Sequence, residues 1–313
     1  MCGIVGYVGD RDCADVLVDA LSKLEYRGYD SAGIAVVEKG VIKVEKCKGR
    51  LANLVDKMAV DGKPQGHCGI GHTRWATHGE PSDINSHPHG NKRVSIVHNG
   101  IIENYKQIKD FLIEEGYSFV SETDTETVAK LLDYYYVDDP VDTIIKVLSE
   151  IKGSYALGIM FRDYPDTVFA VRKECPLIVG VGENENFLAS DVPAIIKYTR
   201  DYYLLEANEI AVVKKDSVQI YDMHKEPVHK EINTADWDVD AAEKGGYEHF
   251  MLKEIHEQPA AVRDTVSPRI INGMPDLSQD GVDMQKLKDY RQIFIVACGT
   301  AMHAGMRSEE HTS

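Results

Sequence analysis

The sequence predicts an α+β fold built from mainly antiparallel sheets, with helices packed on the outer faces of the sheets. Short apolar segments of strand length are numerous in the 313-residue chain, and few of them alternate with helices in the strand–helix–strand order of a parallel sheet. Several longer segments repeat apolar residues at helical spacing, so each of these helices has one face to bury.

The individual elements follow from these two periodicities. The predicted strands are Ile4–Val8, Ala32–Glu38, Val41–Lys46, Gly66–Thr73, Val94–His98, Tyr155–Phe161, Val168–Arg172, Ile178–Val181, Phe187–Ser190, Glu209–Val213 and Val218–Tyr221. The predicted helices are Asp12–Leu24, Leu51–Ala59, Tyr105–Glu114, Thr125–Tyr136, Val141–Ile151, a short one at Val192–Tyr198, and Tyr247–Asp264. Asp12 is a candidate N-cap, and Lys39-Gly40 predicts a hairpin turn.

Two domains are predicted, because the β pattern stops near Asp222 and residues 224–246 are polar and irregular. We therefore expect a first domain at 2–223, a linker at 224–246 and a second domain at 247–313. In the second, a strand at Ile293–Val296 is followed by a small-residue loop, Cys298-Gly299-Thr300, of the kind that binds phosphate through backbone amides. Further strands of an α/β sheet are missing, so this domain is expected to be truncated.

Composition narrows the classes of function. The formal net charge of −16 disfavours binding to nucleic acid or to an anionic membrane. The six cysteines are scattered without a CxxC pair, which argues against a disulfide framework or a zinc ribbon and for a reducing compartment. There is no signal-peptide pattern and no apolar run of membrane-spanning length, so the expected location is the cytoplasm.

The N-terminus carries a candidate nucleophile. Cys2 is the second residue, and removal of Met1 would place a free α-amine on the same residue as the thiol. An α-amine has a pKa of about 7.7–8.0, so it can act near neutral pH as general base for its own side chain. Cys2 taken alone is equally consistent with a buried structural cysteine.

Acyl transfer at such a thiol would need an oxyanion hole, a cation for a substrate carboxylate and an acid for a substrate ammonium. The sequence offers Asn99-Gly100, Arg74 and Asp124, each after a predicted strand or in a loop. The residues alone leave other interpretations open. Asn99-Gly100 is a strong signal for a type I′ turn, Arg74 could form a surface ion pair, Asp124 could cap a helix, and Trp75 could be core.

Several ordered motifs together resemble the glutaminase domain of class II glutamine amidotransferases. They are CGIVGYVG at Cys2–Gly9, YRGYDSAG at Tyr26–Gly33, GHTRWATHG at Gly71–Gly79, HNGIIENY at His98–Tyr105 and SETDTE at Ser121–Glu126. Two later motifs, EHFMLKEIHEQP at Glu248–Pro259 and ACGTAMHAG at Ala297–Gly305, are similar to the branch of this family that aminates fructose-6-phosphate. The resemblance implies a four-layer αββα sandwich of the N-terminal-nucleophile type, followed by the start of an α/β sugar-isomerase domain.

The resemblance also implies residue roles. Cys2 would attack the side-chain amide of L-glutamine, releasing ammonia and forming a thioester that water hydrolyses, with Asn99 and Gly100 as the oxyanion hole. Arg74 would bind the α-carboxylate of glutamine and Asp124 its α-ammonium. The other implied site residues are Thr77 and His78 in the pocket, Trp75 on a closing loop, Arg27 and Gly28 beside the nucleophile, and Cys298, Gly299 and Thr300 in an incomplete sugar-phosphate loop.

A group of histidines invites a metal-site interpretation: His72, His78, His87, His89 and His98 fall in one short stretch. The sequence has neither an HExxH motif nor a cysteine at ligand spacing. We therefore expect hydrogen-bonded structural histidines, no metal and no other cofactor.

The family members are roughly twice as long as this chain, and their ammonia passes through a channel to an isomerase half that makes glucosamine-6-phosphate from fructose-6-phosphate. The resemblance thus implies amino-sugar synthesis and a homodimer only for a full-length enzyme, with this chain at most a glutaminase. Residues 307–313 depart from the family pattern and are expected to be translated sequencing adapter. A module that binds glutamine without turnover remains the alternative from another functional class.

Overall fold

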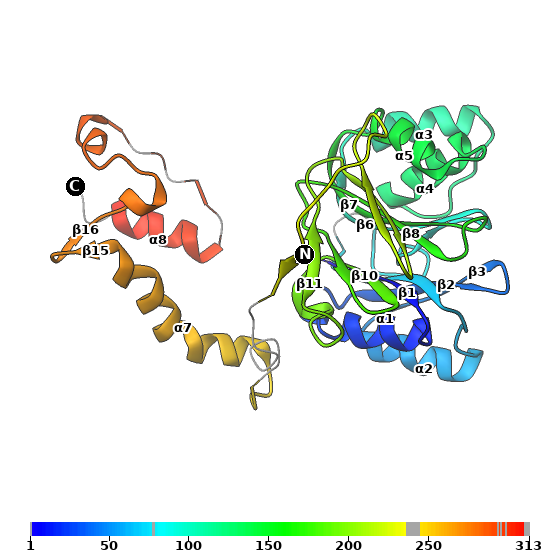
Figure 1. The fold of residues 1–313 in the computed structure, drawn as a ribbon, viewed down its shortest axis with the longest axis horizontal. Helices are drawn as coiled ribbons and strands as arrows, with labels where there is room; N and C mark the ends of the chain where they lie inside the picture. The colour runs from blue at the N-terminus through cyan, green and yellow to red at the C-terminus, as the bar shows by residue number, and fades with distance from the viewer. Residues whose placement is uncertain are drawn as a thin grey trace. The chain divides into compact units, whose positions relative to one another are not determined.

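A computed structural model describes residues 2–76, 79–235, 245–292, 294, 296–297 and 299–309 of the chain. Its backbone divides into two compact units, residues 1–243 and 244–313. The described part of the first unit is a pair of stacked antiparallel sheets between two sets of helices (Figure 1).

The first sheet holds the N-terminal strand near its centre. In spatial order its eight strands are β14 (Asn233–Thr234), β11 (Asp201–Leu204), β9 (Ile178–Val181), β10 (Glu185–Ala189), β1 (Gly3–Gly9), β4 (Cys68–Arg74), β2 (Ser31–Glu38) and β3 (Val41–Lys48). The turn between β2 and β3 is Lys39-Gly40, as predicted, and both residues have positive φ angles, 50° and 77°. Strand β1 pairs with β4 from Gly3 to Val8 and with β10 from Val5 to Gly9, so most of the chain's first strand is fixed from two sides.

The second sheet has six strands. In spatial order they are β13 (Val218–Tyr221), β12 (Ile210–Lys214), β8 (Thr167–Lys173), β7 (Gly153–Phe161), β6 (Val94–Ile102) and β5 (His89–Gly90). All neighbours are antiparallel, and β6 pairs with β7 along its whole length, from Val94 opposite Phe161 to Ile102 opposite Gly153.

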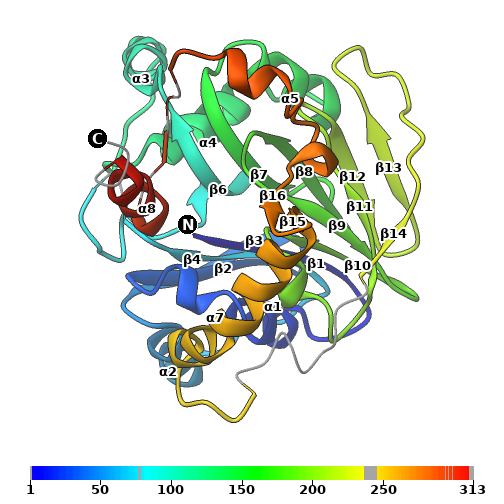
Figure 2. The ribbon, with the colours of Figure 1, turned by 90° about the vertical axis from the view of Figure 1, so that its left-hand side faces the viewer.

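Helices cover the outer face of each sheet (Figure 2). Helices α1 (Cys13–Ser22) and α2 (Leu51–Asp61) pack on the first sheet, and α3 (Tyr105–Glu114), α4 (Asp124–Tyr135) and α5 (Pro140–Leu148) pack on the second. Side chains along β1 alternate between its two faces. Val5 and Tyr7 pack toward the helices, whereas Ile4 and Val8 lie in the core between the sheets. This is the four-layer αββα sandwich that the resemblance predicted.

The helix ends follow local sequence chemistry. The side chain of Asp12 accepts a hydrogen bond from Ala14 N at 3.1 Å and caps α1, as predicted. Asp139 caps α5 in the same way, with Pro140 at the first helical position, where its missing N–H costs nothing. The cap of α4 is Thr123, whose hydroxyl accepts from Glu126 N, so Asp124 is the first residue of the helix instead of its cap.

The predicted linker at 224–246 begins too early. Val228 N donates to Ile220 O at 2.8 Å, and β14 adds Asn233–Thr234 to the edge of the first sheet by pairing with β11. Residues up to 235 therefore belong to the first unit, because even a polar segment can satisfy its backbone on an open sheet edge. Neither β11 nor β14 was among the predicted strands.

The second unit is a small set of elements. Helix α7 (Phe250–Val266) contains Pro259, and a two-stranded hairpin of β15 (Ile270–Ile271) and β16 (Met274–Pro275) follows it. Helix α8 (Gly299–Glu309) includes Gly299 and Thr300 as its first two residues, while Cys298 lies outside the described residues. Of the predicted strand at Ile293–Val296, only Phe294 and Val296 are described, and neither is in a strand.

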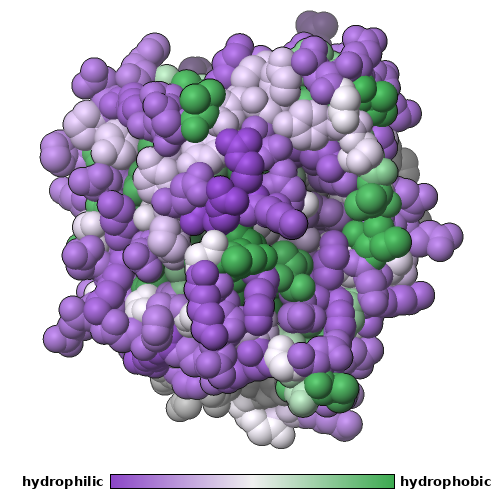
Figure 3. Space-filling model, turned by 90° about the vertical axis from the view of Figure 1, so that its right-hand side faces the viewer, coloured by the Kyte–Doolittle hydropathy of each residue, from purple (hydrophilic) through white to green (hydrophobic). Residues whose placement is uncertain are grey.

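Polar side chains dominate the face of the first unit drawn in Figure 3, where apolar side chains occur in small separate groups. This fits the acidic, charged composition. Among the described residues, none of the helices combines the length and the hydropathy that crossing a membrane requires.

Candidate active site

Cys2 lies just before the central strand β1. It contacts Trp75, the residue that follows the end of β4. Because Gly3 pairs with Thr73, the chain that leaves β4 passes directly beside Cys2. The Trp75 backbone N–H donates to Cys2 Sγ at 3.1 Å, and Trp75 O is 3.5 Å from the same sulfur. The register of two neighbouring strands therefore places a backbone donor on the thiol.

The loop at Gly28 supports this backbone. A Cβ at Gly28 would lie 2.7 Å from both Arg74 C and Trp75 N, so only glycine permits the approach. Asp30 completes the contact: its N–H donates to Arg74 O at 3.0 Å, and its carboxylate accepts from Ala76 N at 2.8 Å. Gly28 and Asp30 thus hold the turn that carries the donor to Cys2.

We expect Gly28→Ala to weaken both stability and catalysis. The added Cβ must displace the Arg74–Trp75 backbone, which should cost about 1–3 kcal/mol of unfolding free energy and move the Trp75 N–H away from Cys2 Sγ. Urea unfolding and glutamate release from glutamine would measure the two effects, with a loss in kcat/KM of about tenfold or more. The control is Gly6→Ala, whose Cβ meets the Leu188 side chain at 2.9 Å and should reduce stability alone. Equal kcat/KM in both variants would contradict this role of Gly28.

Asn99 lies within strand β6 and contacts the backbone of Cys2. Its Nδ2 donates to Cys2 O at 3.0 Å, and its Oδ1 lies 3.0 Å from His72 Nε2. Asn99 pairs with Ala156 and Gly100 with Tyr155, so the pair is not a hairpin turn. Gly100 has a φ of 125°, and a Cβ there would lie 2.1 Å from Ser154 O, which explains the glycine in the middle of the strand.

Arg74 and Asp124 are both buried, with exposed fractions of 4% and 6%. Arg74 ends β4, and its Nη2 donates to Gly79 O at 3.3 Å. Asp124 begins α4, and its Oδ2 accepts from Ile102 N at 2.8 Å, which ties the helix start to the end of β6. Burial lowers the pKa of Arg74, while the nearby Cys2 and Asp124 favour its charged form. The structure therefore brings a buried cation close to Cys2 and a buried carboxylate close to that cation.

Trp75 is 47% exposed, so it is not a core residue. Its ring packs edge-on against Tyr29, with 5.6 Å between the ring centroids. Arg27, in the short 3-10 helix Glu25–Arg27, forms an ion pair with Asp191 and donates from Nε to Tyr26 Oη at 3.0 Å. Thr77 and His78, the other predicted pocket residues, lie outside the described residues.

The thiol of Cys2 needs a base at neutral pH. Burial raises its pKa above the ordinary value, and the Trp75 N–H and Arg74 oppose this shift only in part. The thiol is therefore mainly protonated at pH 7. Reaction at this sulfur requires a group that accepts its proton.

Four of the histidines form one buried cluster that contacts Asn99 through His72: His72, His87, His89 and His98. The rings of His72 and His87 are stacked with centroids 4.1 Å apart, and His89 contacts His87 edge-on at 4.9 Å. His98 Nδ1 lies 2.9 Å from Thr125 Oγ1. Burial lowers the pKa of all four, that of His72 to about 3. They are therefore neutral, hydrogen-bonded histidines.

This cluster should make the protein sensitive to mild acid. In the unfolded chain each histidine binds a proton below a pH of about 6.5, but in the folded chain it stays neutral, so stability is complete above that pH and falls below it. We expect the free energy of unfolding in urea to decrease by about 3–5 kcal/mol between pH 7.5 and 5.5. His89→Gln should make this slope shallower. Stability that is constant over this range would contradict the account.

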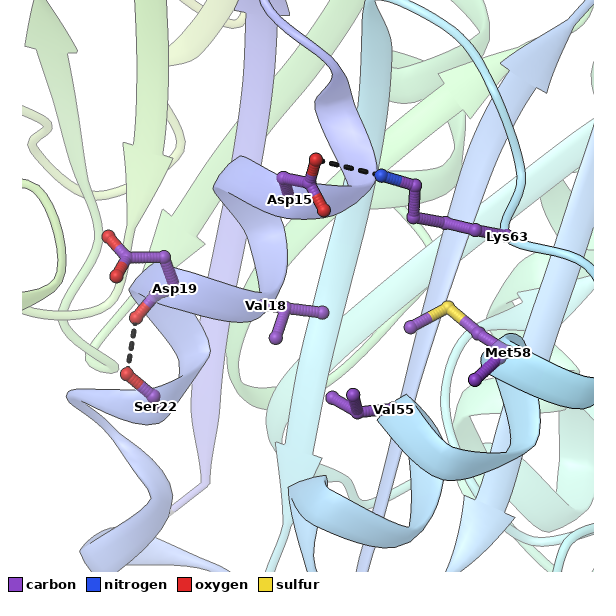
Figure 4. A pocket seen from close by; sticks show the side chains of 8 residues that line it. Asp15, Val18, Asp19, Ser22, Val55, Met58 and Lys63 are labelled. Carbon is purple, nitrogen blue, oxygen red and sulfur yellow. Dashed lines mark hydrogen bonds and ion pairs between the residues drawn. The ribbon is translucent and has the colours of Figure 1, made fainter.

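A hollow lies between α1 and α2, with a volume of about 470 Å³ (Figure 4). Val18, Val55 and Met58 form its apolar lining, and Lys63 at its rim pairs with Asp15 at 2.7 Å. Its lining includes none of the residues that contact Cys2, Asn99 or Arg74. The hollow shows no group suited to acyl transfer, so the candidate active site is at Cys2.

Comparisons with known proteins identify related sequences. Residues 72–197 match the model of a family described as a glutamine amidotransferase domain. The chain is 57% identical over 310 residues to a curated protein of Caldanaerobacter subterraneus subsp. tengcongensis, and 46% identical over 321 residues to one of Methanosarcina acetivorans. Both relatives are named glutamine–fructose-6-phosphate aminotransferase (isomerizing), and the alignments cover 98% of this chain but only 51% and 52% of theirs. The chain thus spans about half the length of these relatives.

Solved structures show the same fold. Glutamine phosphoribosylpyrophosphate amidotransferase of Bacillus subtilis is 24% identical, with a TM-score of 0.62 over 71% of this chain and 49% of that chain. A class II glutamine aminotransferase domain protein of Silicibacter pomeroyi is 13% identical, with a TM-score of 0.52 over 71% of this chain and 99% of that chain. At these identities the likeness concerns the fold alone.

Proposed function

We propose that this chain, which belongs to the glutamine amidotransferases, hydrolyses L-glutamine to glutamate and ammonia through a thioester on Cys2. The observation that carries this proposal is the placement of Cys2 Sγ. It lies 3.1 Å from the Trp75 backbone nitrogen and close to buried Arg74, which is itself near buried Asp124, while Asn99 Nδ2 donates to the Cys2 carbonyl at 3.0 Å. The arrangement thus combines a nucleophile, a polar side chain beside it and a nearby pair of opposite charges that suits an amino acid.

The α-amine of Cys2 is the general base in this proposal, once Met1 has been removed. It accepts the thiol proton, and the sulfur attacks the side-chain amide carbon of glutamine to form a tetrahedral intermediate. The amine then returns the proton to the departing nitrogen, which leaves as ammonia. Water, activated by the same amine, attacks the thioester and releases glutamate and the free thiol. The raised pKa of the buried thiol is the reason that this base is needed.

The tetrahedral intermediate carries a negative oxygen that needs donors. We assign this role to the Asn99 side-chain amide and the Gly100 backbone N–H. Asn99 is suited to it because its Nδ2 already faces Cys2 and its Oδ1 is held from the opposite side. Gly100 is suited because its positive φ turns the backbone out of an ordinary strand conformation next to Asn99.

Two buried charges would bind the amino-acid end of glutamine. The Arg74 guanidinium is matched to the α-carboxylate, and the Asp124 carboxylate to the α-ammonium. We place Thr77 and His78 in the pocket, Trp75 on a loop that closes over it, and Arg27 and Gly28 beside the nucleophile. The half-exposed position of Trp75 on Tyr29 is consistent with such closure.

For a longer protein like the curated relatives, we propose that the ammonia aminates fructose-6-phosphate to glucosamine-6-phosphate, in the cytoplasm and in a homodimer. Residues 2–235 would then be the glutaminase domain, and residues from 247 onward the beginning of the sugar-isomerase domain. Gly299 and Thr300 open α8, where backbone N–H groups favour an anion such as a sugar phosphate.

The test is glutamate release by the purified chain supplied with L-glutamine, with L-asparagine as the control substrate. Asparagine is one methylene shorter, so its amide cannot reach Cys2 while its α-groups occupy Arg74 and Asp124. We expect glutamate from glutamine and no aspartate from asparagine. Saturable glutamine binding without glutamate release, from protein that lacks Met1, would contradict turnover and support a binding module.

A further inference from the structure

The Asn99 side chain is held at both of its ends. Its Nδ2 donates to Cys2 O at 3.0 Å, and its Oδ1 lies 3.0 Å from Nε2 of His72, which is on the neighbouring sheet. An asparagine amide is nearly symmetric in shape, so a half-turn about its last torsion exchanges oxygen and nitrogen with little steric change. Which atom faces Cys2 therefore depends on its hydrogen-bond partners.

The position of the hydrogen on His72 follows from its contacts. Nε2 lies 3.1 Å from the backbone oxygen of His98 as well as 3.0 Å from Asn99 Oδ1. The backbone oxygen can only accept, so Nε2 carries the hydrogen and donates toward both oxygens. Because His72 Nε2–H is a donor, it is compatible with only one orientation of the Asn99 amide. In that orientation the oxygen faces His72 and the nitrogen faces Cys2.

The ring of His72 is itself fixed. It is 1% exposed and stacks on His87 at 4.1 Å with 14° between the planes. His87 is in turn held by the backbone N–H of His98, which donates to its Nδ1 at 3.3 Å. The stack prevents the His72 ring from tilting away from Asn99, so the donor is pre-organised.

We propose that His72 is a positioning residue for glutamine hydrolysis, whose Nε2–H holds Asn99 Oδ1 so that the Asn99 amide nitrogen faces the reacting centre at Cys2. This inference rests on the proposed function, in which Asn99 stabilises the oxyanion. If the amide were reversed, its oxygen would meet the negative oxygen of the intermediate and repel it. His72 thus acts through Asn99 and touches neither the substrate nor Cys2.

Three substitutions separate this role from simple packing. His72→Phe keeps a stacking ring without a donor, His72→Asn places its amide short of Asn99, and His72→Gln puts an NH₂ close to the former Nε2. For His72→Phe and His72→Asn we expect kcat to fall about 10–100-fold while KM changes by less than about threefold, because the loss is confined to the transition state. For His72→Gln we expect kcat within about fivefold of the wild type.

The double variant His72→Phe/Asn99→Ala gives the second readout. If His72 acts only through Asn99, His72→Phe should change kcat by less than about threefold in the Asn99→Ala background. The rate at which iodoacetamide alkylates Cys2 should stay unchanged in all single variants, because no thiol contact is altered. Melting temperatures show that each variant is folded. His72→Asn carries the test if His72→Phe does not fold.

The outcomes are distinct. Absence of glutamate release by the wild-type chain would refute the proposed function itself. An active wild type with unchanged kcat in folded His72→Phe or His72→Asn would overturn the role of His72. The role would also be overturned if His72→Phe lowered kcat equally in the presence and absence of the Asn99 side chain. The same holds if His72→Gln lowered kcat as much as His72→Phe does.

Discussion

Cys2→Ala is expected to abolish glutamate release, lowering kcat by a factor of about 10⁴ or more. The reason is chemical, because Cys2 is the thiol that the described residues place beside Trp75 N and Asn99. The described structure has free thiols at Cys13, Cys47, Cys68 and Cys175 as well. Cys175→Ala is the matched control, since Cys175 is also only partly buried and should be dispensable. Measurable turnover by Cys2→Ala would place the chemistry elsewhere.

Cys2→Ser sharpens this result. A hydroxyl is a much weaker nucleophile near neutral pH than a thiol, yet it occupies nearly the same volume. We expect kcat to fall almost as far as in Cys2→Ala, while the dissociation constant for glutamine, measured by calorimetry, stays within about threefold of the wild type. Loss of binding in Cys2→Ser would show that the sulfur contributes to the pocket more than to the chemistry.

Asp124→Asn is expected to raise KM for glutamine by about 10²-fold or more, with a smaller change in kcat. The asparagine can still accept the hydrogen bond from Ile102 N, now 2.8 Å from Asp124 Oδ2, so the start of α4 keeps its anchor. What disappears is the negative charge proposed to pair with the substrate ammonium. Removing one partner of a buried charge pair costs about 2–5 kcal/mol, which corresponds to this change in KM.

Asp133→Asn is the control for Asp124→Asn because it lies on the same helix. Asp133 is 8% exposed, lies near the C-terminal end of α4 and pairs with Arg93 at 3.3 Å. Its substitution should lower stability without altering KM. A KM that rises equally in both variants would mean that α4 is merely perturbed, and that Asp124 does not bind the substrate.

Most elements of the first unit could be predicted because their signals are local. Helix α3 and strands β9 and β13 match their predicted bounds, since apolar periodicity and turn residues define each within one short window. Strands β11 and β14 were not predicted, because Asp201–Leu204 is half exposed at one side of the sheet and Asn233–Thr234 has only two residues. A strand at the edge of a sheet, or next to it, depends on its neighbours more than on its own pattern.

The candidate site needed more than local pattern. Asn99-Gly100 carries the strongest hairpin signal in short sequences, yet β7 pairs across it and keeps the chain extended. Cys2, Gly28, Arg74 and Asn99 come together only because β4 pairs with β1 in a particular register and β6 of the other sheet stacks against them, an arrangement that no single segment encodes. The family resemblance indicated these residues, and the structure shows that all four lie together.

His72 illustrates what sequence reasoning missed. It was grouped with other histidines as structural because nothing in its own segment points to Asn99, which is on a different sheet. A usable signal was the alternation along β4. His72 and Arg74 stand two residues apart on the same face of the strand, so the pattern places a histidine beside a candidate substrate-binding arginine.

The most direct test of the central claim is the mass of the chain after reaction with an electrophilic glutamine analogue that alkylates nucleophilic thiols. We predict one adduct per chain, located by peptide mapping on Cys2 of protein that has lost Met1, formed in step with the loss of glutamate release and slowed by excess glutamine. Adduct formation on another cysteine, or full glutamate release after complete modification of Cys2, would contradict the account.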